Sequence, residues 1–237
     1  MTESPENPPP SPGGVAFADP SYLAAVVDLL GAIAYGEVSA FERLAEDAKL
    51  APTLEDKVAL AAMASAEFGH LVRLRERLTE LGADPFAAMA PFVKPIDDFH
   101  EHTAPSSWLE GLVKAYVGDG LARDFYREIA ALLDVETRDL ILESLDSTAH
   151  SEFAVDRVRG AIAADHRVGG RLALWGRRLM GEALSQAQRV AAERDALSAL
   201  LAGGVDRPGM DLAALGRMFN RLTERHAQRM EDLGLSA

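Results

Sequence analysis

Apolar residues recur every three or four positions along most of this chain, which is the spacing of amphipathic α-helices. In the first such stretch Leu23, Val26, Leu30 and Ile33 follow these steps, and the series continues to Leu44. The pattern predicts six helices, over residues 20–48, 53–82, 107–134, 134–164, 171–202 and 208–233. Alternating, strand-like stretches bounded by turn residues are scarce, so we expect an all-α fold.

Turn and capping residues separate the expected helices. Thr53 is suited to cap the second helix and Gly82 to end it. Ser107 and Glu110 have the spacing of a capping box, which opens the third helix. Between these two helices, residues 83–105 contain four prolines, and we expect only short helical turns that cross the bundle there.

The same pattern suggests a plan for the whole chain. Residues 1–18 are rich in proline and lack apolar periodicity, so we expect a disordered tail. We expect residues 19–164 to form a four-helix bundle with a crossover at residues 83–105. Residues 165–237 should then form an additional C-terminal helical hairpin that packs on the bundle.

Composition narrows the protein class. The net charge of −13 argues against nonspecific binding to nucleic acid, although residues 161–237 hold 11 basic and 9 acidic side chains and are mildly basic. The absence of cysteine excludes disulfides and thiolate metal sites. The start of the chain lacks the features of a signal peptide, and no uncharged apolar stretch approaches the length of a membrane span. We expect a cytoplasmic protein without a membrane partner.

Five ionisable residues fall where their helices should be apolar. Glu37 lies within the apolar stripe of the first helix, and Glu67 and His70 share one face of the second because they are three positions apart. Asp119 in the third helix and His150 in the fourth repeat this arrangement. The 33 residues from Glu37 to His70 resemble the 31 residues from Asp119 to His150, so we expect two helical hairpins to converge on one site.

A glycine precedes each of the two repeated acids, Gly36 in the first helix and Gly118 in the third. A glycine inside a helix costs about 1 kcal/mol relative to alanine, so its use there suggests a packing reason. We expect the helix backbones to pack closely beside the buried acids at both glycines. The neighbouring Tyr35 and Tyr116 are expected to serve in aromatic packing.

The residue types point to a metal centre. A buried carboxylate is costly to keep charged unless a cation neutralises it. Several carboxylates and two imidazoles in one bundle favour iron, manganese or zinc over calcium or magnesium. Glu67 is placed to bridge two metal ions, with Glu37 and His70 completing one site and Asp119 and His150 the other. Taken singly, each could instead be a hydrogen-bonded structural residue.

This ligand pattern resembles the ferritin-like di-iron carboxylate superfamily and, within it, the tRNA hydroxylases of the MiaE type, over roughly residues 20–160. The resemblance implies a ferritin-like four-helix bundle in which a di-iron centre uses dioxygen and an electron donor. Its implied substrate is the isopentenyl group of 2-methylthio-isopentenyl-adenosine in tRNA. A further likeness, to an actinobacterial set of ferritin-like proteins, is carried by Ala34-Tyr35-Gly36-Glu37 and Trp108-Leu109-Glu110-Gly111.

Two departures from the family pattern affect the second metal. The third-helix ligand, glutamate in the family, is the shorter Asp119, and the second Glu-x-x-His motif has Ser147 in place of its glutamate. Glu143 lies on the same face but one turn away, about 6 Å along the helix. We therefore expect two iron ions, with the second weakly bound or absent and completed by Glu143 or by water at Ser147. Manganese is an alternative to iron.

The last helix carries an arginine ribbon, defined as Arg217, Arg221, Arg225 and Arg229, which repeat every four residues. Such a ribbon could contact the phosphates of a folded tRNA. The simpler interpretation is a solvated face or a protein interface, in which the arginines pair with acids of the same helix such as Glu224, Glu231 and Asp232.

Three functions stay open at this point. The leading hypothesis is a non-haem di-iron, dioxygen-dependent hydroxylase, with tRNA and an electron donor as partners. The second is a ferritin-like metal-binding, structural or partner-binding protein with a degenerate site. The third is an iron or peroxide oxidase without an organic substrate. The sequence is compatible with a monomer or a homodimer.

Overall fold

The computed structural model describes residue 17 and residues 19–145, 149–203 and 209–237. These residues form nine α-helices and a short 3-10 helix at Ala48–Leu50, without any strand, which confirms the predicted all-α class. The helices are α2 Pro20–Asp47, α3 Leu54–Glu80, α4 Pro85–His102, α5 Trp108–Ala130, α6 Val135–Ser144, α7 Ala149–Ala164, α8 His166–Glu193, α9 Asp195–Ala202 and α10 Leu212–Asp232.

The predicted caps begin and end several helices. The Thr53 hydroxyl accepts a hydrogen bond from the Asp56 N–H at 3.1 Å, and the Ser107 hydroxyl accepts one from the Glu110 N–H at 3.3 Å. Each of these bonds satisfies an N–H group that has no partner within its own helix. Gly82 follows α3 with a φ of +76°, a left-handed conformation that glycine adopts without strain.

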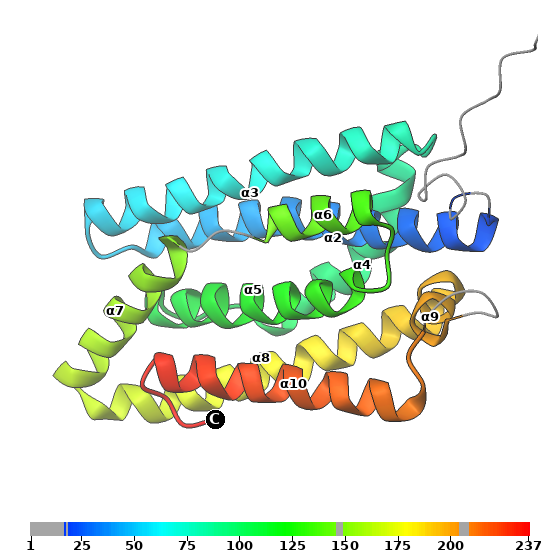
Figure 1. The fold of residues 1–237 in the computed structure, drawn as a ribbon. Helices are drawn as coiled ribbons and strands as arrows, with labels where there is room; N and C mark the ends of the chain where they lie inside the picture. The colour runs from blue at the N-terminus through cyan, green and yellow to red at the C-terminus, as the bar shows by residue number, and fades with distance from the viewer. Residues whose placement is uncertain (1–16, 18, 146–148, 204–208) are drawn as a thin grey trace, which may run out of the picture.

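The long helices lie side by side along the molecule (Figure 1). Helix α2 packs against α3, α4 and α9, while α5 packs against α8 and α10. Helices α2 and α5 run antiparallel, since Asp47 lies against Gly111 whereas Gly36 lies near Tyr126. The short helix α7 crosses one end of the molecule, where it contacts α5 and α8.

Helix α2 is a long apolar helix of the core. Together with the 3-10 turn it spans Pro20–Leu50 and is long and apolar enough to cross a membrane, with a mean hydropathy of 1.5 in its most apolar window. Half of that window is buried against the rest of the protein, and it contains Asp28 and Glu37. A buried core helix passes the same test of length and composition, and the packing of α2 explains its apolar character.

The crossover differs from its prediction. Instead of short turns, the structure contains the continuous helix α4, which runs through Pro91 and Pro95. Each internal proline removes one backbone hydrogen bond, but the apolar side of α4, including Met89 and Phe92, is buried against the neighbouring helices. The backbone of α4 at Ala88 approaches α2 so closely that a side chain at Gly31 would collide with it.

Two predicted helices are each interrupted. The helix expected over residues 134–164 ends at Ser144 and resumes as α7 at Ala149. The helix expected over residues 171–202 begins earlier, at His166, and breaks at Arg194 between α8 and α9. At that break the Arg194 guanidinium binds the carboxylate of the buried Asp28 in α2. This long-range ion pair has no signature in the local sequence around residue 194.

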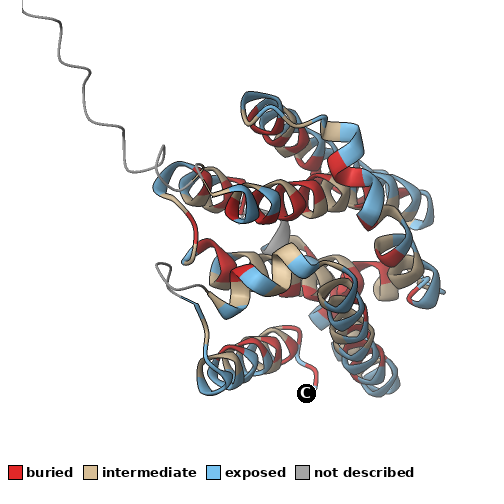
Figure 2. Cartoon of the chain, turned by 90° about the vertical axis from the view of Figure 1, so that its right-hand side faces the viewer, coloured by how far each residue is buried: buried red, intermediate tan, exposed pale blue. Residues whose placement is uncertain are grey.

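The buried side chains gather in two apolar clusters. One surrounds the first half of α2 and includes Leu30 and Leu74. The other surrounds the end of α2 and includes Leu44 and Met230. Buried residues face the inside of the helical assembly in the end-on view of Figure 2. Glu37 belongs to neither cluster and lies on α2 between the two.

Candidate metal centre

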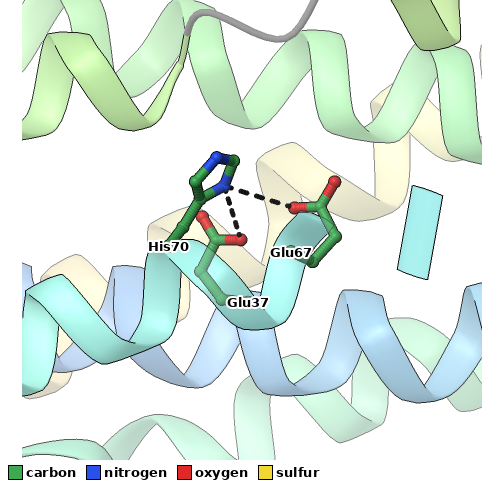
Figure 3. A group of neighbouring side chains, drawn as sticks. All are labelled: Glu37, Glu67 and His70. Carbon is green, nitrogen blue, oxygen red and sulfur yellow. Dashed lines mark ion pairs between the residues drawn. The ribbon is translucent and has the colours of Figure 1, made fainter. Parts of the chain in front are cut away.

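Two neighbouring helices bring three metal-ligating side chains together. Helix α2 contributes Glu37, and one face of α3 contributes Glu67 and His70. The His70 Nδ1 atom lies 3.5 Å from Glu37 Oε2 and 3.9 Å from Glu67 Oε2. One ligand atom from each residue lies within 4.8 Å of the others. Figure 3 shows the imidazole and both carboxylates pointing toward one another.

The burial and the hydrogen bonding of the three side chains are compatible with a bound metal ion. Exposed fractions are 12 % for the Glu37 side chain, 8 % for Glu67 and 19 % for His70. Glu37 Oε2 and His70 Nδ1 are buried without a hydrogen-bond partner among the described residues. Unpartnered buried polar atoms are rare because leaving them unpaired costs free energy. A cation coordinated by the two atoms would satisfy both.

The electrostatics of the two glutamates lead to the same conclusion. Burial, with help from the nearby Asp119 carboxylate, raises the pKa of Glu37 to about 7. Burial and the adjacent Glu37 carboxyl group raise the pKa of Glu67 to about 8. Without a metal, the pair therefore holds protons near neutral pH. A divalent cation would displace these protons and stabilise both carboxylates.

Asp119 lies near this group but is paired differently. Its carboxylate forms an ion pair with Arg123 at 2.8 Å, one turn along α5. Its side chain is 42 % exposed and lines the cavity described below. Burial and the Glu67 carboxylate raise the pKa of Asp119 to about 6, against the opposing effect of Arg123. Its predicted role as a ligand of the second metal stays a prediction.

The rest of the predicted second site is not assembled by the described residues. Glu143, predicted as a possible ligand, instead accepts a hydrogen bond from Arg73 at 2.8 Å and is 64 % exposed. Ser147 lies outside the described residues, and so does the side chain of His150. The described part of the chain therefore contains one group of three ligands, with Asp119 beside it.

An apolar cavity of about 370 Å³ adjoins the carboxylates. Glu37, Glu67 and Asp119 line it together with residues of α4, α8 and α9 that are mostly apolar. Gly36 and Gly118 line it as well. The expectation of closely packed backbones at these glycines was wrong: a Cβ at Gly118 would meet no atom within 4 Å, and one at Gly36 would meet only the Tyr126 hydroxyl at 3.5 Å. The glycines leave space for the cavity.

Arg123 and Tyr126 are the residues of this region that the sequence pattern did not reveal. Both follow Asp119 at helical spacing, four and seven positions later, which is the signal that could have identified them. Burial raises the pKa of Tyr126 above its usual range, so its hydroxyl stays protonated beside Glu37 and Asp119. Tyr35 and Tyr116 pack against the apolar clusters, and their hydroxyls donate hydrogen bonds to Asp97 and Asp232.

Three arginines of the ribbon pair with acids of α5 rather than with acids of their own helix. Arg221 binds Glu128 through two hydrogen bonds, and Arg225 lies 3.3 Å from the same carboxylate. Arg229 binds Asp124, whose side chain is only 4 % exposed. These pairs join α10 to α5 within the chain, which corrects the expected partners of the three arginines. Arg217 is exposed to solvent.

Comparison with known proteins agrees with this architecture. The family model of a ferritin-like domain of actinomycetes matches residues 20–204. Among solved structures, the chain is similar to Protein 19 with aldehyde deformylating oxidase activity from Synechococcus, with a TM-score of 0.71 and 20 % identity over 93 % of this chain and 94 % of that one. That likeness shows the fold. Among curated proteins, no match is found. The chain belongs to the ferritin-like domain family of actinomycetes.

Proposed function

We propose that this protein is a metal-dependent oxidase that uses dioxygen to oxidise an elongated, apolar organic substrate. One observation carries the proposal: Glu37 and Glu67, two of the three side chains that could hold a metal ion together with His70, line an apolar cavity of about 370 Å³. That volume lies in the range of ligand-binding cavities. A protein that only stored or oxidised iron would not need an apolar cavity beside its carboxylates.

The chain's own residues have distinct roles in this proposal. Glu37, Glu67 and His70 hold the metal, which supplies the redox chemistry with dioxygen that amino-acid side chains lack. Arg123 balances the charge of Asp119 beside them. The apolar wall excludes water and aligns the substrate chain, which places a chosen carbon near the metal centre.

Iron is the metal that we propose, with manganese as the alternative. Two carboxylates and one imidazole suit either ion. The described ligands form one site, and a second ion would rest on Asp119 and on residues 147 and 150. The similar protein from Synechococcus has an oxidase activity, which supports a redox-active metal here and makes long-chain aldehydes the first substrates to test.

A narrower form of the proposal is hydroxylation of the isopentenyl group in tRNA. The observation in its favour is the exposed Arg217 on the mildly basic α10. Because Arg221, Arg225 and Arg229 already pair with α5, tRNA would have to compete with these ion pairs. Arg217→Glu is therefore the clean test, since it should weaken tRNA binding at low salt without loosening α10.

The main experiment loads metal-free protein with ferrous iron without oxygen, measures bound iron, and then follows oxygen uptake with long-chain aldehydes, alkanes and isopentenyl-modified tRNA. We expect at least one iron per chain and substrate-dependent oxygen uptake with the chain-like compounds. His70→Ala should lose most of the iron. His102→Ala is the matched control, since His102 is half exposed and pairs with Glu182 away from the site.

Other results would point to other functions. Oxygen uptake that requires iron but does not increase with any of the organic compounds would favour an iron or peroxide oxidase. Dependence on modified tRNA alone would favour the tRNA hydroxylase. Absence of bound iron in the presence of excess ferrous iron would contradict the proposal and leave a structural or partner-binding role.

A further inference from the structure

The cavity has a polar end, separate from the metal centre. Four of its lining residues form this polar end: Arg43 and Asp47 of α2, His100 of α4 and Lys114 of α5. The four groups are close enough for their charges to shift one another's pKa values. The charge of Lys114 lowers the pKa of Asp47 and of His100, and the charge of Arg43 lowers the pKa of all three other groups. In the opposite direction along α2, the cavity is lined by apolar residues down to Leu29.

The polar end has hydrogen-bonding capacity that the protein itself does not use. Lys114 is only 6 % exposed, and its ammonium group donates to one described acceptor, the Thr103 carbonyl at 2.8 Å. An ammonium group has three donors. Arg43 Nε and His100 Nδ1 are buried and have no hydrogen-bond partner among the described residues. Unused donors facing a cavity point to a ligand that accepts hydrogen bonds.

The charges favour an anionic acceptor. Burial lowers the pKa of Lys114 to about 8, so its ammonium group is still mostly charged at pH 7. Burial raises the pKa of Asp47, while the nearby charges of Lys114 and Arg43 oppose this shift. Burial and the two neighbouring cations keep His100 neutral, with a pKa of about 3. Arg43 pairs with Glu46 at 3.0 Å at the surface, so Lys114 is the cation left without a carboxylate within ion-pair distance among the described residues.

We propose that this polar end binds the carboxylate of a fatty-acid-like substrate, whose apolar chain runs along the cavity past Glu37. The inference rests on the proposed function and narrows its substrate to amphipathic acids. Arg43 and Asp47 lie six and ten residues beyond Glu37 on one helix, which places the polar end about 9 to 15 Å from the metal centre. The metal would therefore face the middle of the chain, remote from the carboxylate.

The test measures binding to metal-free protein by calorimetry at pH 7, comparing decanoate with the primary alcohol of the same chain length. We expect decanoate to bind at least about tenfold more tightly, as a charge-assisted hydrogen bond to a buried lysine provides. Lys114→Met, which keeps an unbranched side chain one atom shorter and removes the charge, should bring the two affinities within about twofold of each other. Lys94→Met is the control, because Lys94 is 81 % exposed and pairs with Asp98, and should leave the preference unchanged.

Circular dichroism establishes whether Lys114→Met is folded. A second variant, Arg43→Gln, changes a side chain that is 41 % exposed and should also reduce the preference for decanoate over the alcohol. Equal affinities in the wild type, no binding of either compound, or a preference that persists in both variants would overturn the inference. The binding measurement needs no metal, so its failure is distinguishable from failure of the proposed function, which is read from iron content and oxygen uptake.

Discussion

At the level of single residues, the candidate metal centre is built from side chains that are costly to bury. Glu67 is more than nine-tenths buried beside Glu37, and its raised pKa expresses the cost of keeping it charged there. Residues that lower the stability of the folded protein are often kept because they have a function. Metal binding offsets this cost, because a cation favours the ionised form of both glutamates.

This cost leads to a prediction in which stability and metal binding change in opposite directions. Glu67→Gln should raise the unfolding free energy of metal-free protein at pH 8 by about 1 to 3 kcal/mol, because it removes a buried carboxylate. The same change should abolish tight iron binding. Urea denaturation and calorimetry measure the two effects. Glu143→Gln, a surface change of the same chemistry, should alter stability by less than about 1 kcal/mol and leave iron binding intact.

A second residue-level prediction concerns pH. His100 is kept neutral in the folded protein by burial and by Lys114 and Arg43, with Asp47 nearby, whereas in the unfolded chain it takes up a proton below pH 6.5. Between about pH 3 and 6.5 the unfolded state therefore binds more protons, so the unfolding free energy should rise with pH, by up to about 1.4 kcal/mol per pH unit from this group. Denaturation of His100→Phe should show a smaller slope over this range, and an unchanged slope would contradict the assignment.

How much the sequence could predict differs from residue to residue. The grouping of Glu37, Glu67 and His70 follows from helical periodicity, because two acids and an imidazole at apolar positions of one hairpin must meet. The pairing of Asp119 with Arg123 follows the same spacing rule, because residues four positions apart share one face of a helix. The polar end of the cavity could not be predicted, because Arg43, His100 and Lys114 come from three helices whose relative placement is decided by packing.

At the level of helices, ion pairs between distant segments help to determine where a helix ends, which the local sequence pattern does not predict. The break at Arg194 depends on Asp28, more than 160 positions earlier, and no glycine or proline marks it. Helix α4 shows the opposite case, since its prolines predicted an irregular crossover while its buried apolar side preserves a helix. Periodicity therefore predicted where helices exist, and tertiary contacts determined where they end.

The contact between α10 and α5 gives a testable consequence. Arg229 is 15 % exposed and pairs with the buried Asp124, so Arg229→Met should lower the unfolding free energy by about 2 to 3 kcal/mol. This loss is at or just below the lower end of the range of about 3 to 5 kcal/mol for breaking a buried pair, because Arg225 and Arg127 lie near the same carboxylate. Arg217→Met, at an exposed position of the same helix, should change it by no more than about 0.5 kcal/mol in the same urea titration. If both substitutions changed the unfolding free energy equally, the buried ion pair between Arg229 and Asp124 would be refuted.

At the level of the whole molecule, the fold places the candidate metal centre between two apolar clusters and beside a cavity. Gly36 and Gly118 matter at this scale, since both lie where a side chain would enter the cavity. The sequence shows the repeated pair of a glycine and an acid. It does not show that the glycines line a cavity, because the cavity also depends on the positions of α4, α8 and α9.

Filling the cavity should separate substrate binding from metal binding. We expect Gly118→Leu to weaken decanoate binding at least about tenfold, since leucine would occupy part of the chain's path, while iron content stays unchanged. Gly160→Leu is the matched control, because Gly160 lies in α7 with open space around it and outside the cavity lining. Calorimetry and metal analysis on both variants check the result, and equal loss of decanoate binding in both would argue that the ligand lies elsewhere.

The central claim is that Glu37, Glu67 and His70 hold a metal ion, and X-ray diffraction at the iron absorption edge tests it most directly. Crystals of protein loaded with ferrous iron without oxygen should show an anomalous peak within coordinating distance of all three side chains, and crystals of His70→Ala should lose it. A map without a peak between these residues, or with iron only at surface carboxylates, would contradict the account.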